Sequence, residues 1–217
     1  MSKHHRNRNW APAPQPLPED AHVIDNHTHV ASVVPFSQAM SHEAMEKGQG
    51  EVPVYSVDEL LEQAQKVGVE GVIDCGCELP NLMTAIDMAR EHPGTVHAAI
   101  AIHPNEAVLH GHRGAPGPDG LPIKYKPWHD IPFDEAMAEV HRLATTYPNQ
   151  VVAIGETGMD LFRTGESAKE LQREAFRAHV ALAKELNLPM QIHDRDSHKE
   201  VIETLLADGA PERTGFH

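Results

Sequence analysis

The stretches VVAIGE, residues 151–156, and LPMQIH, residues 188–193, decide the fold of this chain. Each is a short apolar run that ends in a chemically active side chain, and such runs are typical of buried β-strands. Between them, Leu171, Ala175 and Leu182 recur at the spacing of one helix face. A strand, a helix and a second strand in succession indicate a βαβ unit with parallel strands.

The same alternation runs through the rest of the chain. Further strands are expected in AHVIDNHTH from residue 21, GVIDCG (71–76), VHAAIAIH (96–103) and TGFH (214–217). Helices are expected after a capping box of Ser56 and Glu59, from near Pro80, through Met137, Val140 and Leu143, after a second capping box of Ser167 and Glu170, and around Leu205 to a stop near Gly209. Apolar strands alternating with helices favour a parallel sheet that helices cover.

The positions of the active side chains favour a barrel over an open sheet. They follow the first, third, fourth and fifth expected strands, and an open sheet would concentrate function at one switch point. In a TIM barrel the site gathers at the C-terminal ends of many strands. We therefore predict an α/β fold, a TIM (β/α)8-type barrel with about six of the eight strand–helix units present.

Three segments lie outside this regular pattern. Residues 1–20 are predicted to be a disordered tail, and residues 21–217 a single barrel domain. Residues 31–55 and residues 105–132 are predicted to be long loops on the active face, and the second is a loop insertion crowded with Gly and Pro.

Composition limits the classes of function. Lys plus Arg number 18 and Asp plus Glu 32, which gives a net charge of −14, whereas a long groove for duplex DNA normally has a basic excess. No apolar stretch is long enough to span a bilayer, and the N-terminus lacks the apolar block of a signal peptide. We expect a cytoplasmic protein with no membrane partner. Cys75 and Cys77 are expected to be reduced, with a buried structural role.

The candidate metal site consists of His27, His29, Glu156 and His193. The strand period of two puts both imidazoles of His27-Thr28-His29 on one face, so they can converge on one ion. Glu156 follows an apolar strand between glycines, where a carboxylate can bridge two cations. His193 ends the LPMQIH strand. Any one of these residues is more often a satisfied core or turn residue, but all four at strand ends predict a metal site.

The motifs VIDNHTH, AIHPNE, AIGETGMDLFRT, LQREAFRAHVALAKELNLPMQIHDRD and GFH resemble the TatD family of metal-dependent deoxyribonucleases, from residue 22 onward. The resemblance implies an amidohydrolase-type TIM barrel, one or two divalent metal ions (Mg, Mn or Zn) and hydrolysis of phosphodiester bonds at DNA ends. It implies that His27 and His29 bind a first metal, that Glu156 bridges as the catalytic residue, and that His193 and His217 bind a second.

The resemblance also assigns residues to the substrate. His103 and Arg195 would lie near its phosphate, although an ion pair of Arg195 with a neighbouring acidic residue is about as expected. Asp25 and Asp160 could orient metal-bound imidazoles, or simply form hydrogen bonds at strand ends.

The family barrel has eight strands, and an aspartate after the eighth acts as general base. The last two strand–helix units and this aspartate are expected to be absent here. We favour the interpretation that the sequence is a fragment. Assembly with a second copy through the open barrel edges, or a non-catalytic relative, are the alternatives.

The sequence leaves three candidate functions. The first is a DNA exonuclease that uses a metal-activated water. The second is an ester or amide hydrolase such as an aminoacyl-ester deacylase, and the third is a truncated metal-binding or interaction module without turnover.

Overall fold

The computed structural model describes residues 15–48, 53–111, 125–164 and 166–217. They form two compact units: Met1–Asp25 with Val30–Gly71 is unit 1, and Asn26–His29 with Val72–His217 is unit 2. The expected single domain over residues 21–217 stays a prediction. Most of the predicted tail lies outside the described residues, but its described end is held in unit 1, where the Leu17 N–H donates to the Val67 carbonyl at 2.9 Å.

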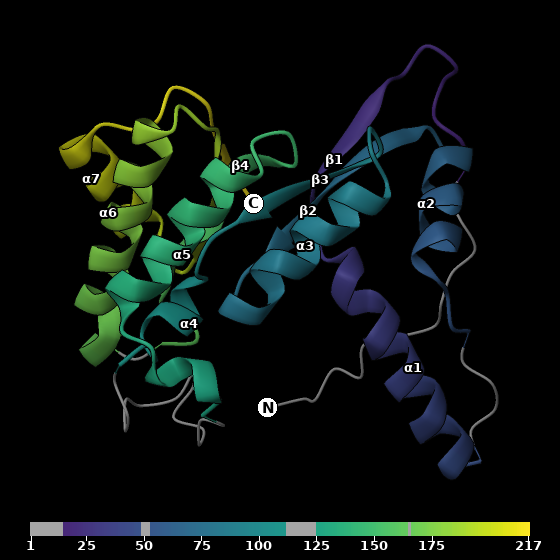
Figure 1. Ribbon diagram of the computed structural model, residues 1–217, viewed down its shortest axis with the longest axis horizontal. Helices are drawn as coiled ribbons and strands as arrows, with labels where there is room; N and C mark the ends of the chain where they lie inside the picture. Colours follow the sequence, from purple (N-terminus) through teal and green to yellow (C-terminus); the bar gives the residue numbers. More distant parts are fainter. Residues whose placement is uncertain (1–14, 49–52, 112–124, 165) are drawn as a thin grey trace. The chain divides into compact units, whose positions relative to one another are not determined.

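Six parallel strands in the order β1-β2-β3-β4-β5-β6 form a curled half barrel with helices (Figure 1), which confirms the predicted fold class. The strands are β1 (Val23–Thr28), β2 (Val69–Gly76), β3 (Val96–Ile100), β4 (Val151–Asp160), β5 (Met190–Arg195) and β6 (Thr214–Phe216). Each strand pairs with the next in sequence, so the carboxyl ends that carry the active side chains lie along one rim.

The helices of unit 2 follow the order of its strands. They are α3 (Leu79–Glu91), α4 (Pro104–Ala107), α5 (Phe133–Thr146), α6 (Lys169–Glu185) and α7 (His198–Asp208), with short 3-10 turns η2 (Pro127–Asp130) and η3 (Glu166–Ala168). Helix α3 packs on β3 and next to α5, α5 next to α6, and α6 next to α7 (Figure 1). Gly209, at a φ of 78°, ends α7 as predicted.

The inner face of the half barrel has a layer of small side chains. Cys75, Ala99 and Ala153 are aligned across β2, β3 and β4 by the strand register, and all three are buried. Ile73 and Cys77 pack against them. A layer of small residues leaves space for longer side chains from other strands to reach the interior.

Strand β4 is longer and less regular than predicted. It was expected to end at Glu156, but it continues to Asp160, with a register shift against β5 between Ile154 and Thr157. Gly158 allows the close approach, because a Cβ at this position would lie 2.1 Å from the His193 carbonyl oxygen. The irregular segment puts two carboxylates, Glu156 and Asp160, on one strand.

The described residues of unit 1 form two helices, of which one was predicted. Helix α2 (Val57–Lys66) begins with the expected capping box of Ser56 and Glu59. The prediction that residues 31–55 form a loop is wrong for its first part, because α1 (Val30–Glu46) is a helix. Its buried residues are small, and Pro35 lies within it, so neither apolar spacing nor composition indicated a helix.

The second predicted capping box is not formed. Helix α6 begins at Lys169, and its N-cap is Ala168, which makes no side-chain cap. The 3-10 turn η3 includes Ser167, which places that residue before the cap position.

The predicted insertion at 105–132 lies partly outside the described residues. Its two flanks are joined: His129 Nε2 lies 2.8 Å from Glu106 Oε2, and the Gly111 N–H donates to the His129 carbonyl at 2.9 Å. The described flanks form α4 and η2 and so are not an extended loop.

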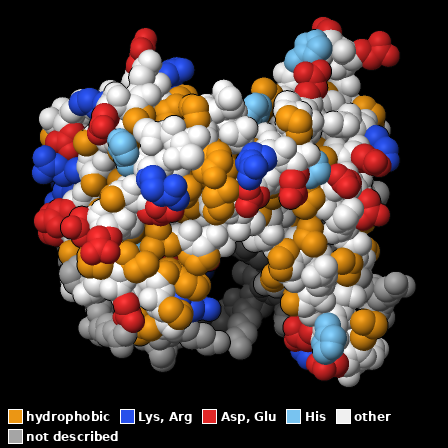
Figure 2. Space-filling model, viewed as in Figure 1, with side chains coloured by type: hydrophobic (Ala, Val, Ile, Leu, Met, Phe, Trp, Pro, Cys, Tyr) orange, Lys and Arg blue, Asp and Glu red, His pale blue; other side chains and the backbone are white. Residues whose placement is uncertain are grey.

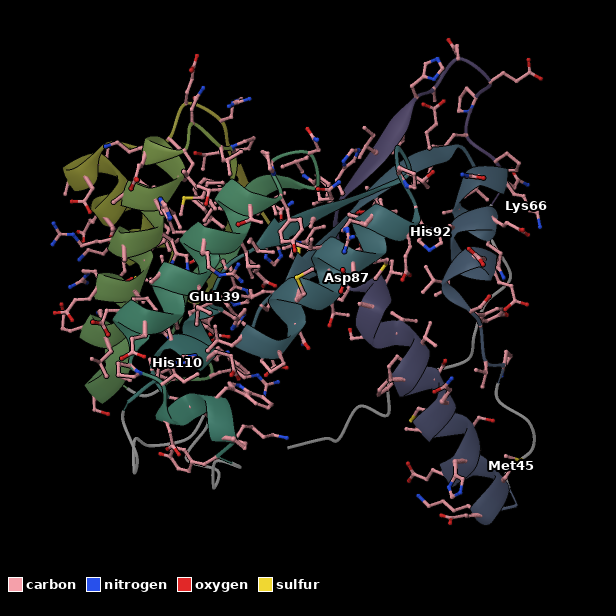
Figure 3. All side chains as sticks on the ribbon, viewed as in Figure 1. Met45, Lys66, Asp87, His92, His110 and Glu139 are labelled. Atoms are coloured by element: carbon pink, nitrogen blue, oxygen red, sulfur yellow. The ribbon has the colours of Figure 1, made fainter. Side chains whose placement is uncertain are left out.

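The outer helix surfaces carry local ion pairs. Figure 3 labels Asp87 on α3 and Glu139 on α5, which pair with Arg90 at 2.9 Å and Arg142 at 2.7 Å on their own helices. Within the described residues, every helix falls short of the length and apolar character that a membrane crossing requires.

Candidate metal centre

Glu156 is the centre of the candidate site. Its side chain is only 6% exposed, and imidazoles surround it. A buried carboxylate costs free energy unless charged or hydrogen-bonding partners compensate it. Each of its two oxygens faces a different set of side chains, and this division defines two halves of the site.

Three side chains lie nearest to Oε2 of Glu156. The Nε2 atoms of His27 and His29 are each 3.5 Å from it, and Cys77 Sγ is 3.6 Å away. His27 and His29 lie at the end of β1, two residues apart, with their rings 5.0 Å apart edge to face. The predicted convergence of this pair is therefore present.

Three other imidazoles lie nearest to Oε1 of Glu156. His193 Nδ1 is 2.6 Å away, His217 Nε2 is 3.0 Å away, and His103 Nε2 is 3.4 Å away. They come from β5, from the residue after β6, and from the N-cap of α4. All predicted metal-site histidines thus gather around one carboxylate.

His217 is held by backbone as well as by ring contacts. Its N–H donates to the Ile192 carbonyl at 3.1 Å, which extends the pairing of β5 with β6. Its ring stacks on His27 at a centroid distance of 3.7 Å and meets His193 edge to face at 5.4 Å. The imidazole therefore lies between the two halves of the site.

His193 lies between two carboxylates. Its Nδ1 faces Glu156 and its Nε2 lies 3.2 Å from Asp160 Oδ2. Burial lowers the pKa of His193, but hydrogen bonds to Asp160 and Glu156 outweigh burial and raise that pKa to about 9. Without a metal ion this ring therefore carries a proton at neutral pH.

A buried polar network holds Asp160. Asn105 Nδ2 donates to Asp160 Oδ2 at 2.9 Å, and the Arg163 N–H donates to Oδ1 at 2.8 Å. Gln172 accepts from the Asp160 N–H at 2.9 Å and donates to Thr164, which donates in turn to Asn105 Oδ1. Burial raises the pKa of Asp160, and these donors with His193 overcome burial to lower it to about 2.

The pKa values of Glu156, His27 and His29 also depend on burial and on neighbouring side chains. Burial raises the pKa of Glu156, but hydrogen bonds from His103, His193 and other imidazoles hold it far below its usual range. Burial and the neighbouring His217 lower the pKa of His27. Hydrogen bonding to Glu156 raises the pKa of His29.

A backbone contact sets the hydrogen-bonding direction of His103. The Asn105 N–H donates to His103 Nδ1 at 3.1 Å, so this nitrogen carries the lone pair. In the neutral ring the proton then lies on Nε2, which faces Glu156. His103, Glu156 and His193 form a group close enough to hold an ion. The direction of the backbone bond nevertheless makes His103 a donor to an anion rather than a metal ligand.

Arg195 is exposed at the end of β5, and the expected ion pair with an acidic neighbour is not formed with any described residue. Its guanidinium carbon lies 4.0 Å from the ring centroid of Phe162. Phe162 is 48% exposed, and Arg163 approaches the same ring at 5.8 Å. The acidic neighbour Asp194 pairs with His198 at 2.5 Å.

The donor set fits a divalent ion. His27, His29 and Glu156 form one group whose ligand atoms lie within 4.8 Å of one another, and His103, Glu156 and His193 form a second, in which Glu156 and His193 can act as ligands because the Nε2 of neutral His103 carries a proton. Imidazole and carboxylate ligands suit zinc, manganese and iron. A carboxylate that presents one oxygen to each group can bridge two ions.

The predicted ligand residues lie together around Glu156, and their role as metal ligands stays a prediction; several side chains that support them were not predicted. Asp160 contacts His193, whereas Asp25 is exposed on β1, and an orienting role for either residue stays a prediction. Cys77 faces Glu156, although it was expected to be structural only. Asn105 and Gln172 were not singled out; the AIHPNE motif contained a signal for the first, and nothing in the helix pattern distinguished the second.

Comparison with known proteins places the chain among related sequences. The model of a family described as TatD-related DNase matches residues 24–217. An uncharacterized metal-dependent hydrolase TatD of Mycobacterium tuberculosis is 32% identical over 166 residues, which cover 75% of this chain and 53% of that protein. A 3'-5' ssDNA/RNA exonuclease TatD of Erwinia tasmaniensis is 32% identical over 148 residues, which cover 68% of this chain and 48% of that protein.

Solved structures agree on the fold. A TatD family hydrolase from Entamoeba histolytica has a TM-score of 0.62 at 20% identity, covering 87% of this chain and 55% of that one. A TatD homologue from Escherichia coli has a TM-score of 0.59 at 24% identity, covering 88% and 57%. The chain spans about half the length of the curated relatives it matches.

Proposed function

This chain belongs to the TatD-related DNase family, and from that premise we propose that it carries the metal site of a hydrolase that removes nucleotides from ends of single-stranded DNA. The observation that carries the proposal is Glu156, whose two oxygens face two histidine groups. One relative bears the name 3'-5' ssDNA/RNA exonuclease, and that name supports a nucleic-acid end as substrate.

We assign the ligands by the oxygen of Glu156 that they face. His27 and His29 would hold one divalent ion on the Oε2 side, and His193 with His217 would hold a second on the Oε1 side. Magnesium, manganese and zinc are the candidate ions. A divalent ion bound there supplies positive charge that activates water and stabilises the phosphoryl group.

The remaining side chains would handle the substrate. The Nε2–H of His103 can donate to a phosphate oxygen, because its Nδ1 accepts the Asn105 N–H. Arg195 offers a guanidinium fork for a phosphate, and Phe162 offers an exposed ring for a base. Asp160 holds His193 from the side opposite Glu156 and can keep a proton on that ring.

The test compares two isosteric substitutions. Glu156→Gln removes the central charge, and we expect it to lower both Mn²⁺ binding and nucleotide release by on the order of 100-fold. Glu139→Gln is the matched control, because among the described residues Glu139 pairs with the exposed Arg142 of its own helix, and its replacement should change neither quantity. Calorimetric titration with Mn²⁺ and release from a labelled single-stranded oligonucleotide measure the two effects. Full activity of Glu156→Gln would refute the assignment.

Charge favours a second candidate. The net charge is −14, and on the face in Figure 2 Lys and Arg side chains are interspersed with Asp and Glu. A polyanion would therefore be attracted only locally, and a small ester would meet less repulsion. Single-stranded DNA, aminoacyl-RNA and a small phosphoester, assayed with the same metal, discriminate these substrates. Tight metal binding without turnover of any of them would instead indicate a non-catalytic metal-binding module.

Cytoplasmic location and self-association remain proposals that belong with this function. Localisation of the tagged protein in its own cells tests the first.

A further inference from the structure

A chain of polar contacts, buried at Cys75 and Gln191 and partly exposed at its β1 end, runs across the half barrel to the candidate ligand His27. Its members are Asn26 and His27 on β1, Cys75 on β2 and Gln191 on β5. The Gln191 amide nitrogen donates to the Asn26 carbonyl, Cys75 Sγ lies 3.2 Å from Gln191 Oε1, and Cys75 Sγ lies 3.4 Å from His27 Nδ1. The metal-ligand and substrate roles proposed above use neither Cys75 nor Gln191.

The packing around Cys75 and Gln191 is close. Cys75 is 6% exposed and Gln191 is 8% exposed. Ala99 and Ala153 border the thiol with small side chains. Gly155 makes room for the amide, because a Cβ on Gly155 would lie 2.5 Å from the Cβ of Gln191. In such surroundings each polar atom depends on its protein partners.

The Asn26 carbonyl fixes which group donates and which accepts in each of these hydrogen bonds. A carbonyl oxygen can only accept, so the group of Gln191 that faces Asn26 must be the NH₂ group. Oε1 of Gln191 then faces Cys75, and because Oε1 can only accept, the thiol S–H must donate to it. The thiol has used its single proton, so its sulfur accepts from the Nδ1–H of His27.

We propose that Cys75 and Gln191 are positioning residues that hold His27 as its Nδ1–H tautomer, with the Nε2 lone pair directed to the metal site. Nε2 is the nitrogen that lies 3.5 Å from Glu156 Oε2. Metal-ligating histidines usually donate their other ring N–H to a partner that fixes the tautomer. Here the partner is a thiol backed by an amide. His103 has the opposite tautomer, because a backbone N–H donates to its Nδ1 and leaves the proton on Nε2. In this proposal His27 is therefore a metal ligand and His103 a hydrogen-bond donor.

The proposal rests on the proposed metal site, but its first readout does not need a metal. Imidazole nitrogen NMR of the metal-free chain at pH 8 reports the tautomer of His27. We expect Nδ1–H in the parent protein and in Cys75→Ser, whose hydroxyl keeps a donor and an acceptor. We expect a mixture of tautomers in Cys75→Ala and in Gln191→Met, which keeps side-chain length without the amide.

The second readout is Mn²⁺ affinity by calorimetric titration. Cys75→Ala and Gln191→Met should raise the dissociation constant about 10- to 100-fold, and Cys75→Ser should restore it. Val72→Ala is the control, since it removes a buried side chain of the same strand outside the polar chain and should change stability alone. If Cys75→Ala does not fold, Gln191→Met carries the test.

Three results would overturn the proposal: an unchanged tautomer in Gln191→Met, an unchanged dissociation constant despite a changed tautomer, or an equal tautomer change in Val72→Ala. A parent chain that binds no Mn²⁺ would count against the proposed function, and the tautomer measurements would still judge the hydrogen-bond chain by itself.

Discussion

At the scale of single residues, the site depends on close backbone approaches as much as on ligands. Gly158 has a φ of 145°, and its hydrogen takes the place where a Cβ would overlap the His193 carbonyl. The segment from Glu156 to Asp160 therefore lies against β5 only because glycine occupies this position. A change at Gly158 should act on His193, the ligand that follows on the neighbouring strand.

Gly158→Ala tests this dependence. Gly94→Ala is a matched control, because Gly94 also has a positive φ, 83°, but has open space around its Cβ position. Both variants acquire backbone strain, and Gly158→Ala acquires a backbone overlap in addition. Urea unfolding should show Gly158→Ala to be less stable than Gly94→Ala by about 1 to 3 kcal/mol. Equal stability of the two variants would contradict the close packing of β4 on β5.

Prediction at the residue level identified side chains that gather around Glu156, whose role as metal ligands stays a prediction, and it missed several side chains that support them. His27, His29, Glu156 and His193 were identifiable because each follows an apolar strand, and the parallel order of strands brings such ends together. The contacts of Cys75 and Gln191 were not identifiable, because they cross from β2 and β5 to β1. No local spacing records which side chains meet across a curled sheet.

At the scale of elements, a buried neutral histidine anchors α6 to the segment that follows β3. His179 accepts the Ile102 N–H on Nε2 at 3.1 Å and donates from Nδ1 to the Ala175 carbonyl at 2.8 Å. Burial lowers the pKa of His179 from 6.5 to about 4. Protonation would remove the acceptor that Ile102 requires, so the folded state resists it.

This anchor predicts acid sensitivity. The unfolded chain binds a proton at His179 near pH 6.5 and the folded chain only near pH 4, so stability is complete above pH 6.5 and falls as pH falls toward 4. At pH 5 the free energy of unfolding should be about 2 kcal/mol lower than at neutral pH because of His179. His179→Gln keeps an acceptor that does not titrate. Urea unfolding at pH 7 and pH 5 should show a smaller difference in this variant, and identical pH dependence would contradict the assignment.

Helix α2 provides a prediction about capping. Ser56 Oγ accepts the Glu59 N–H at 3.2 Å, and Glu59 accepts the Ser56 N–H at 2.8 Å. Ser56→Ala should cost about 1 kcal/mol and speed hydrogen exchange of the Glu59 amide on the order of fivefold. The control is Thr84→Ala on α3, whose hydroxyl bonds the Pro80 carbonyl within the helix and caps nothing. Exchange that is unchanged in Ser56→Ala would show the capping box to be unimportant.

Elements were predictable where periodicity or capping chemistry was strong. The six strands and α2, α3, α5, α6 and α7 follow from apolar runs and helical spacing. Helix α1 was missed because it buries Ser37, Ser41 and Ala44, which carry no hydrophobic pattern. The extension of β4 to Asp160 was missed because two glycines resemble a turn signal in sequence.

At the scale of the whole molecule, β6 lies at one end of the strand order, and in the described part of the chain its sheet neighbour is β5 alone. Its Phe216 is 52% exposed. An unpaired strand edge with an apolar side chain favours association with another strand. The expected self-association of this chain is therefore a testable consequence of its strand order.

Sedimentation velocity over a range of concentrations should detect that association. Phe216→Lys should weaken it on the order of tenfold, because a charge at a strand edge opposes pairing. Leu206→Lys is the control: Leu206 is 79% exposed on α7, and its replacement leaves the β6 edge unchanged. If only Leu206→Lys weakens association, the contact lies on the surface of α7 and not at the β6 edge. A monomer at all concentrations would contradict association through either surface.

The two oxygens of Glu156 make the two halves of the site thermodynamically dependent on each other. In the proposed site, an ion held by His27 and His29 would share this carboxylate with an ion held by His193 and His217, so an ion on one side would withdraw negative charge from the other while fixing the carboxylate in place. The withdrawal of charge opposes the binding of a second ion, whereas the fixing of the carboxylate favours it. Metal titrations should therefore show cooperativity whose sign reports which effect is larger, and independent, identical isotherms would mean that the two effects cancel or that the ions do not share this carboxylate.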